Sequence, residues 1–138
     1  MEFTCGQTVR LYDTDAAGFL FYGSQFRFAH AALEEFLAHL GLPIGAILRE
    51  RATLFPVVHA EADYRAPLTA GDRLTVRVGV RALGERSFTI AYRFLFPDDR
   101  EAGSVLTVHS ALDTATGASR PLPEAVRAAL APYLTAPA

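Results

Sequence analysis

The sequence predicts an α+β fold in which one antiparallel sheet of about five strands is covered by one long helix. Residues 24–40 repeat their apolar side chains every three to four positions, which is the period of a helix. After residue 55 the period changes to two, and short turns separate four alternating segments. Short turns join antiparallel neighbours, and a sheet that is apolar on one face needs a cover. The 138 residues are most simply one domain, 1–138.

The chain opens on a predicted strand, which is followed by a loop rich in turn-forming residues. Phe3, Cys5 and Val9 alternate with polar side chains and indicate the strand within residues 3–11. The loop has the sequence Tyr12-Asp13-Thr14-Asp15-Ala16-Ala17-Gly18. Its Asp and Thr side chains can hydrogen-bond their own backbone, which is typical of a turn.

The long helix is predicted to follow this loop. Its apolar stripe consists of Phe26, Ala29, Leu33, Phe36, Leu37 and Leu40. Ser24 occupies the expected N-cap position, and Gly41-Leu42-Pro43 is typical of a helix end. The start of a helix carries unpaired N–H groups and a partial positive charge, which favour an anion or a polarised carbonyl. A carboxylate-bearing loop beside such a helix start is a usable reaction site.

Four more strands complete the predicted sheet. Their apolar sides consist of Val58, Ala60, Ala62 and Tyr64; Leu74, Val76, Val78, Val80 and Ala82; Phe88, Ile90, Tyr92, Phe94 and Phe96; and Leu106, Val108 and Leu112. Short helices are expected at residues 44–51 and after Pro123. Only the helix of about residues 24–39 is long enough to cover the sheet. A curved antiparallel sheet wrapped around one central helix is the hot-dog fold.

Composition argues against several classes of function. A formal net charge of −2 without a basic run gives no electrostatic footprint for nucleic-acid binding. No apolar run is long enough to span a bilayer and no secretion signal is visible, so we expect a cytoplasmic protein without a membrane partner. The single Cys5 excludes a disulfide within the chain.

Three segments of the chain resemble the 4-hydroxybenzoyl-CoA thioesterase family of hot-dog proteins. They are residues 12–18, Phe55-Pro56-Val57-Val58-His59-Ala60 and Pro67-Leu68-Thr69-Ala70-Gly71-Asp72. The resemblance covers nearly the whole chain and implies an acyl-CoA thioester hydrolase that needs no metal or redox cofactor. A helix carrying His30 and Glu34 makes the sequence similar to the branch that acts on 1,4-dihydroxy-2-naphthoyl-CoA. This branch implies an aromatic acyl group.

The resemblance also implies catalytic roles for two positions. Asp15 matches the family's catalytic carboxylate, a nucleophile or general base, and the backbone N–H of Tyr22 matches the group that polarises the thioester carbonyl. Many members carry a His at the position of Tyr22, so this sequence favours backbone polarisation over an imidazole. Judged from the residues alone, Asp15 can equally shape the loop as an Asx-turn, and Asp13 is the better candidate for a structural carboxylate.

The remaining candidates are substrate-binding residues, each with a structural alternative. Phe19 and Phe21, together with Tyr22, Phe26 and Phe55, can line an acyl pocket, although aromatic residues are ordinarily core.

His30 and Glu34 lie one helical turn apart and can face each other, or be solvated. His59 stands beside Glu61 and Asp63 and is expected to be a hydrogen-bonded structural His, not a metal ligand. Arg86 and Ser87 match a turn that family members place against the nucleotide end of CoA; otherwise they form a solvated hairpin tip.

Other functions and assemblies remain open at this point. A non-catalytic acyl-CoA-binding or regulatory hot-dog module is one alternative, and a thioesterase for short aliphatic acyl-CoA is another. The carrier can also be a protein instead of CoA. A single wrapped sheet leaves its edges open, so we expect a homodimer or homotetramer. The hot-dog proteins that this chain resembles build each site from two chains, so we expect Asp15 of one subunit to face the partner's Arg86.

Overall fold

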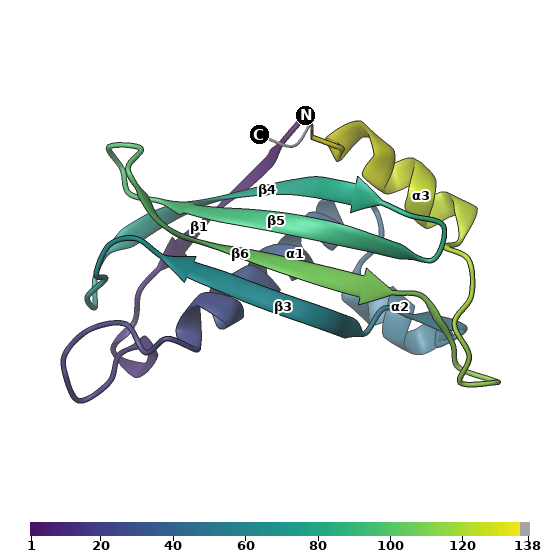
Figure 1. Ribbon diagram of the computed structural model, residues 1–138, viewed down its shortest axis with the longest axis horizontal. Helices are drawn as coiled ribbons and strands as arrows, with labels where there is room; N and C mark the ends of the chain where they lie inside the picture. The colour runs from purple at the N-terminus through teal and green to yellow at the C-terminus, as the bar shows by residue number, and fades with distance from the viewer. Residues whose placement is uncertain (136–138) are drawn as a thin grey trace.

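The computed structural model describes residues 1–135, apart from the side chains of Ile44 and Leu48, so the last three residues of the predicted domain lie outside it. A five-stranded antiparallel sheet has the strand order β1-β4-β5-β6-β3 (Figure 1). These strands are β1 Phe3–Thr8, β4 Arg73–Leu83, β5 Ser87–Leu95, β6 Glu101–Ser110 and β3 Val57–Tyr64. The other elements are the helices α1 Ser24–His39, α2 Ile44–Glu50 and α3 Glu124–Leu130, the 3-10 turns Leu11–Asp13 and Ala131–Tyr133, and the short strand pair β2 Thr53–Leu54 and β7 Leu112–Asp113.

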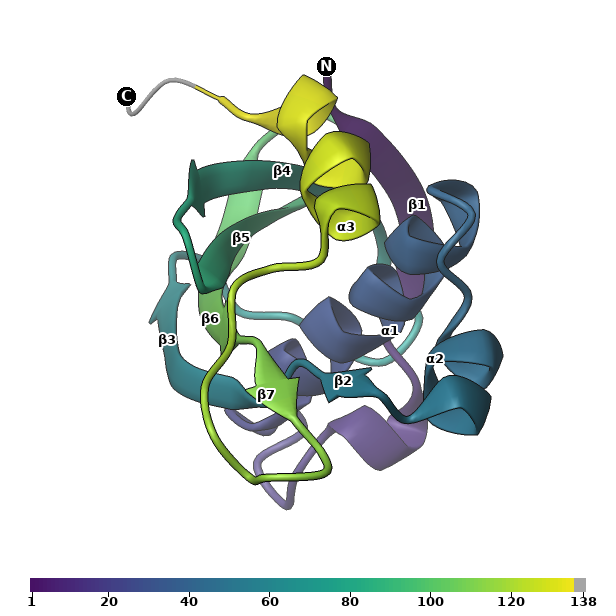
Figure 2. The same cartoon turned by 90° about the vertical axis from the view of Figure 1, so that its right-hand side faces the viewer.

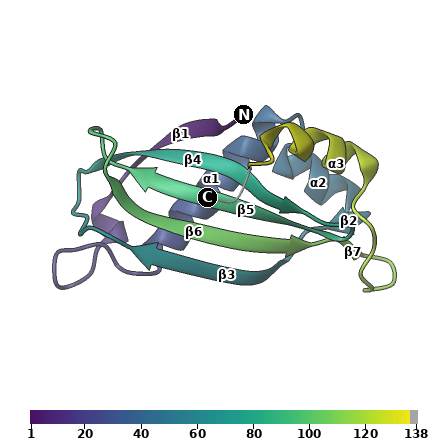
Figure 3. The same cartoon turned by 45° about the horizontal axis from the view of Figure 1, so that its top comes forward.

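The sheet curves around α1, which lies in its concave face (Figure 2). Apolar side chains from α1 and the sheet form the core, including Phe28, Phe36, Val78, Ile90 and Phe94, each no more than 1% exposed. Helices α2 and α3 and the β2–β7 pair gather at the end of the molecule opposite the loop that precedes α1 (Figure 3). The predicted α+β hot-dog architecture is therefore confirmed. In residues 1–135, every helix is too short or too polar to cross a bilayer.

Helix α1 buries a different stripe from the predicted one. Phe28, Ala29, Ala32 and Phe36 are at most 2% exposed and pack on the sheet. Phe28 and Ala32 were not in the predicted stripe, whereas Leu33 is only partly buried. The helix is apolar over a wider arc than one seam, and the sequence pattern cannot tell which part of that arc meets the sheet.

The start of α1 also differs from the prediction. Gly23 is the N-cap residue and makes no side-chain capping bond, so the prediction of Ser24 as N-cap is wrong. Ser24 is the first helical residue, and its hydroxyl instead donates to the main-chain oxygen of Asp13 at 2.9 Å. That bond connects the loop to the helix.

Strand β6 turns the opposite face inward from the one predicted. Val105, Thr107 and His109 are buried, whereas Leu106 and Val108 are only partly buried. Thr107 and His109 pair with the inward-facing residues of β5, which fixes their direction. Two polar side chains are tolerated there because each is hydrogen-bonded.

Strand β3 forms one edge of the sheet and is mostly exposed. Seven of its eight residues are exposed, and Val57, Val58 and Tyr64 are each about half exposed or more. A long exposed edge with apolar side chains is a surface on which another strand can pair. The register with β6 shifts between Val57 and His59, so a bulge interrupts the strand near its start.

Candidate active site

Asp13 ties the loop before α1 to the helix. Its carboxylate is 1% exposed and accepts hydrogen bonds from Arg27 Nε and Nη2, both at 2.8 Å, and from the backbone N–H of Arg10 at 2.9 Å. The hydrogen bond from Arg27 to Asp13 raises the pKa of the guanidinium. The main-chain oxygen of Asp13 also accepts the N–H of Phe21 at 2.9 Å. Every acceptor of this residue is used within the chain, which is a structural role.

Asp15 is exposed and keeps one carboxylate oxygen uncommitted. Oδ1 accepts the N–H of Ala17 at 2.9 Å, which forms an Asx-turn. The turn closes further because Gly18 donates to the Asp15 carbonyl and Asp15 donates to that of Phe19, both at 3.0 Å. Oδ2 accepts no hydrogen bond from any group in residues 1–135. The turn thus holds the carboxylate in place and leaves an oxygen free for chemistry.

The start of α1 offers unpaired donors. Ser24 N–H donates to Phe21 at 2.9 Å and Phe26 N–H donates to Gly23 at 3.1 Å. The backbone N–H groups of Tyr22 and Gly23 have no acceptor in the part of the chain that the structure describes. Such donors at a helix start stabilise negative charge that develops on a nearby oxygen.

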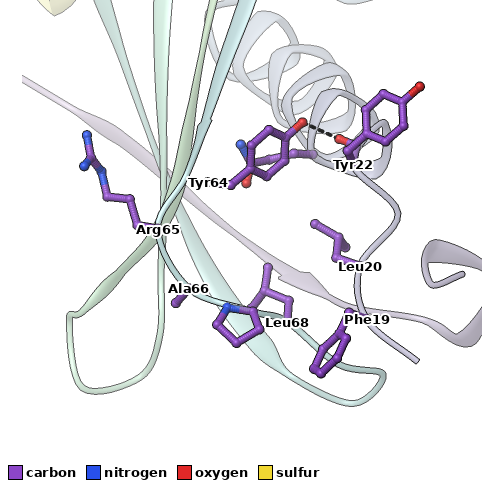
Figure 4. Close-up of a pocket in the computed structure, with 9 residues that line it drawn as sticks. Phe19, Leu20, Tyr22, Tyr64, Arg65, Ala66 and Leu68 are labelled. Atoms are coloured by element: carbon purple, nitrogen blue, oxygen red, sulfur yellow. Dashed lines mark hydrogen bonds between the residues drawn. The ribbon is translucent and has the colours of Figure 1, made fainter. Parts of the chain in front are cut away.

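A cavity of about 350 Å³ lies at this helix start, and we call it the helix-start cavity. It is lined by Phe19, Leu20, Tyr22, Gln25, Tyr64, Arg65, Ala66, Pro67 and Leu68 (Figure 4). Phe19 and Leu20 after the Asp15 turn, the first turn of α1 and the end of β3 contribute to it, whereas Asp15 itself is not a lining residue. Leu20 N–H donates to the Leu68 carbonyl at 2.8 Å and holds two of these walls together.

Of the predicted aromatic set, only Phe19 and Tyr22 line the helix-start cavity. Phe21 packs on Tyr22 with ring centroids 4.6 Å apart and does not line it. All three are large and exposed, by 49%, 69% and 44% for Phe19, Tyr22 and Phe21. Large exposed apolar side chains gathered in this way are typical of a surface that meets a ligand or another chain.

A second cavity of about 440 Å³ lies at the opposite end of the molecule, and we call it the lateral cavity. Its lining is mostly apolar and comes from α1, α2, α3, β2 and the adjoining ends of β3, β5 and β6. His30, a predicted substrate-binding residue, and Phe55, named as a possible acyl-pocket residue, line it. Glu34 does not, and no hydrogen bond or ion pair joins Glu34 to His30 in the described residues. Both side chains are exposed, which corresponds to the solvated alternative for these two residues.

His109 also lines the lateral cavity and was missed by the sequence reasoning. Its ring is stacked on Phe88 at 4.9 Å, and Nδ1 lies 3.1 Å from the Phe55 carbonyl. Nε2 lies 2.8 Å from Thr107 Oγ1, which in turn lies 3.2 Å from the Tyr92 hydroxyl. Burial lowers the pKa of His109, so the ring is neutral at neutral pH.

The proton positions along these hydrogen bonds follow from the Phe55 carbonyl at one end. A carbonyl can only accept, so Nδ1 of His109 carries the proton and Nε2 accepts from Thr107. The Tyr92 hydroxyl then donates to Thr107. The alternation of Thr107 and His109 between apolar residues was the only available signal, and it resembles an ordinary outward face.

His59 lies on the exposed edge strand and lines neither cavity. Its Nε2 is 3.2 Å from Glu61 Oε2, and both side chains are more than half exposed, in keeping with the predicted hydrogen-bonded His. Within residues 1–135, no three His, Cys, Asp or Glu side chains gather in a way that could hold a metal ion.

Arg86 and Ser87 lie far along the sheet from the helix-start cavity. Arg86 Nη1 donates to the Ser119 carbonyl at 3.0 Å in an exposed turn between β4 and β5. Ser87 is near the Val57 end of β3, since both strands pair there with the last residues of β6. Tyr64, which lines the helix-start cavity, is at the other end of β3. One chain alone does not bring these candidates together.

The sequence and fold match known thioesterases. Residues 9–130 match the Thioesterase-like superfamily, and the chain belongs to this family. It is 34% identical over 119 residues to a 1,4-dihydroxy-2-naphthoyl-CoA hydrolase of Synechococcus elongatus, covering 86% of this chain and 87% of that protein.

Two solved structures share the fold over nearly their whole length. A 1,4-dihydroxy-2-naphthoyl-CoA thioesterase from Synechocystis superposes with a TM-score of 0.88 at 26% identity, covering 95% of this chain and 96% of that one. A gentisyl-coenzyme A thioesterase superposes with a TM-score of 0.82 at 30% identity, covering 93% and 98%. The predicted family and the thioesterase class are confirmed.

Proposed function

We propose that this protein hydrolyses the thioester bond of an aromatic acyl-CoA of the hydroxybenzoyl or dihydroxynaphthoyl type. The observation that carries the proposal is the free Oδ2 of Asp15 in a loop that leads directly into the unpaired N–H groups of Tyr22 and Gly23. A nucleophile or base beside preorganised donors is the arrangement that acyl transfer requires. The names of the similar enzymes supply the acyl class.

In the proposed reaction, Asp15 acts on the thioester carbonyl carbon directly or through a water molecule that it deprotonates. Negative charge develops on the carbonyl oxygen, where the N–H of Tyr22 stabilises it. The C–S bond then breaks and the CoA thiolate leaves. If Asp15 attacks directly, water cleaves the resulting anhydride and restores the carboxylate.

We further propose that the protein is a homodimer that pairs through β3. The strand rises about 3.4 Å per residue, so its ends lie roughly 24 Å apart. Antiparallel pairing of β3 with its own copy about a two-fold axis places the Tyr64 end of one strand beside the Val57 end of the other. The helix-start cavity includes Tyr64 and the lateral cavity includes Val57. Each helix-start cavity would then adjoin the partner's lateral cavity.

This pairing explains why one chain holds the site in separate parts. The acyl ring would enter the partner's apolar lateral cavity, where His30 is a polar contact for a ring hydroxyl. The partner's Arg86, at the same end of the sheet as that cavity, would be placed near the nucleotide end of CoA. A guanidinium is well suited to bind phosphate.

The test is a hydrolysis assay over a panel of acyl-CoAs, including 1,4-dihydroxy-2-naphthoyl-, 4-hydroxybenzoyl-, butyryl- and palmitoyl-CoA. We expect turnover of the aromatic substrates. Tight binding of acyl-CoA without turnover would instead indicate a binding module, in which the Asx-turn with Ala17 is the whole role of Asp15. Higher kcat/KM on an aliphatic substrate would retain the thioesterase and reject the aromatic class.

A further inference from the structure

We propose that Gln25 is a positioning residue that fixes the start of α1, and with it the carbonyl-polarising N–H groups, against the sheet. Gln25 lies in the first turn of α1 and is 1% exposed. Its Nε2 donates to the main-chain oxygens of Asp63 on β3 and Ser104 on β6, both at 2.9 Å. One side-chain amide thus connects the helix start to two strands. The inference rests on the proposed function, because it concerns the same site.

The orientation of the amide is determined by its partners. If the amide were flipped, its oxygen would face two carbonyl oxygens, so Nε2 must occupy the donor position. The oxygen Oε1 is then buried without any hydrogen-bond partner among the described residues. An unpaired buried oxygen is unfavourable, and an apolar residue of similar volume would avoid it. Stability alone therefore does not explain why a Gln occupies position 25.

Gly103 on β6 leaves room for this amide, because it has no side chain. A methyl group added at Gly103 would overlap Oε1 of Gln25 and approach the Asp63 oxygen to 2.8 Å. The neighbouring strand therefore lacks a side chain at the point where the amide lies.

Tyr64 makes a second connection between the same two elements. Its hydroxyl donates to the main-chain oxygen of Tyr22 at 2.5 Å. Tyr22 thus bonds Tyr64, and Gln25 bonds the preceding residue of β3, Asp63. Tyr22, Gln25 and Tyr64 line the helix-start cavity. The residue whose N–H we assign to the thioester oxygen is held by its own carbonyl, within one turn of Gln25.

The decisive variant is Gln25→Met, which keeps the length and volume of the side chain and removes both donated bonds. A donor displaced by about 1 Å can reduce turnover up to 100-fold, so we expect kcat to fall at least tenfold, with KM within about twofold. The melting temperature should not fall in proportion, because the orphan oxygen disappears as well. Gln7→Met is the matched control: within residues 1–135 this amide bonds only the neighbouring Thr8 carbonyl on β1, and it lines neither cavity.

A second readout does not depend on the reaction. Hydrogen exchange of the peptide covering residues 19–26 should be at least tenfold faster in Gln25→Met, while peptides of β4 and β5 are unchanged. Tyr64→Phe should show the same pattern to a smaller extent, and it serves if Gln25→Met fails to fold. A folded Gln25→Met with wild-type kcat and exchange would overturn the inference. If the wild type hydrolyses no acyl-CoA, the proposed function fails, and the exchange data alone decide whether Gln25 holds the helix start.

Discussion

The carboxylate of Asp13 and the guanidinium of Arg27 form a two-pronged ion pair with both N–O distances at 2.8 Å. Asp13 stands two residues before Asp15, and Arg27 lies in α1, the helix that begins two residues after Tyr22. The pair therefore sets the separation between the proposed catalytic carboxylate and the proposed carbonyl-polarising N–H.

Loss of this pair should affect stability more than chemistry. We expect Asp13→Asn to lower the free energy of unfolding by about 1–3 kcal/mol, because Arg27 and the Arg10 N–H lose a charged, buried acceptor. Denaturant unfolding measures this. Asp98→Asn is the control: Asp98 forms a fully exposed pair with Arg100, also at 2.8 Å, and its replacement should leave stability nearly unchanged. Equal effects of the two variants would contradict the structural role of Asp13.

Asp15→Asn should abolish most turnover and keep the fold. The amide oxygen can still accept the Ala17 N–H, so the Asx-turn survives, but the side chain can neither attack nor take a proton. A nucleophile or general base predicts a loss on the order of 100-fold or more in kcat. Asp113→Asn is a close control, since Asp113 accepts the Ala115 N–H at 2.9 Å in the same kind of turn. Near-normal turnover by Asp15→Asn would remove the proposed mechanism.

The proposed site shared between two chains predicts complementation between inactive variants. In solution we expect a mass about twice the 15.0 kDa of the chain, or a multiple of this dimer. Asp15→Asn and His30→Ala should each be impaired as homodimers, and co-expressed chains should regain about a quarter of wild-type activity through heterodimers with one intact site. A chain that carries both substitutions forms homodimers without an intact site, so it should show no recovery of activity. An active monomer, or the absence of any recovery, would argue against a site built from two chains.

The buried His109 predicts a specific loss of stability in mild acid. Burial lowers its folded-state pKa below the value near 6.5 expected for the unfolded chain. As the pH falls below about 6.5, the unfolded state takes up a proton that the folded state does not, so the free energy of unfolding decreases. Denaturant unfolding at pH 7.5 and 5.5 should show this decrease in the wild type and a smaller one in His109→Gln. His59→Gln, an exposed control, should behave like the wild type.

Much of this fold was predictable because each main element has a clear local period. The alternation of Leu74, Val76, Val78 and Val80 gave the correct inward face of β4, and all four are at most 4% exposed. Strand β6 was assigned the wrong face because Thr107 and His109 are buried through tertiary hydrogen bonds, which no local pattern encodes.

The site was predictable only in part, for a related reason. The loop carrying Asp15 and the helix start at Tyr22 are adjacent in sequence, and the structure places them together. Gln25 was not predicted, because its partners are 38 and 79 residues away along the chain. Arg86 and Asp15 are separated within one chain, and the proposal that they meet rests on an assembly that neither local sequence nor a single subunit contains.

The last prediction concerns the acyl group. We expect 1,4-dihydroxy-2-naphthoyl-CoA or 4-hydroxybenzoyl-CoA to have a higher kcat/KM than butyryl- or palmitoyl-CoA. The lateral cavity of about 440 Å³ is lined mostly by apolar side chains including Phe55 and Phe88, against which a flat ring can pack. An aromatic contact of this kind contributes roughly 0.5–1.5 kcal/mol beyond area burial, up to about tenfold in kcat/KM.

The polar contact provides the sharper discrimination. In the lateral cavity His109 has both ring nitrogens engaged within the chain, whereas His30 makes no hydrogen bond within the described residues. We therefore propose that His30 is the residue that meets a ring hydroxyl. A site that hydrogen-bonds a substrate hydroxyl rejects an analogue without it more strongly than an apolar pocket rejects a methylene. His30→Leu should therefore lower kcat/KM for 4-hydroxybenzoyl-CoA by at least tenfold and change it little for benzoyl-CoA. Glu34→Gln, one turn away and outside the cavity, should affect neither substrate. Equal losses on the two substrates would show that His30 does not contact the hydroxyl.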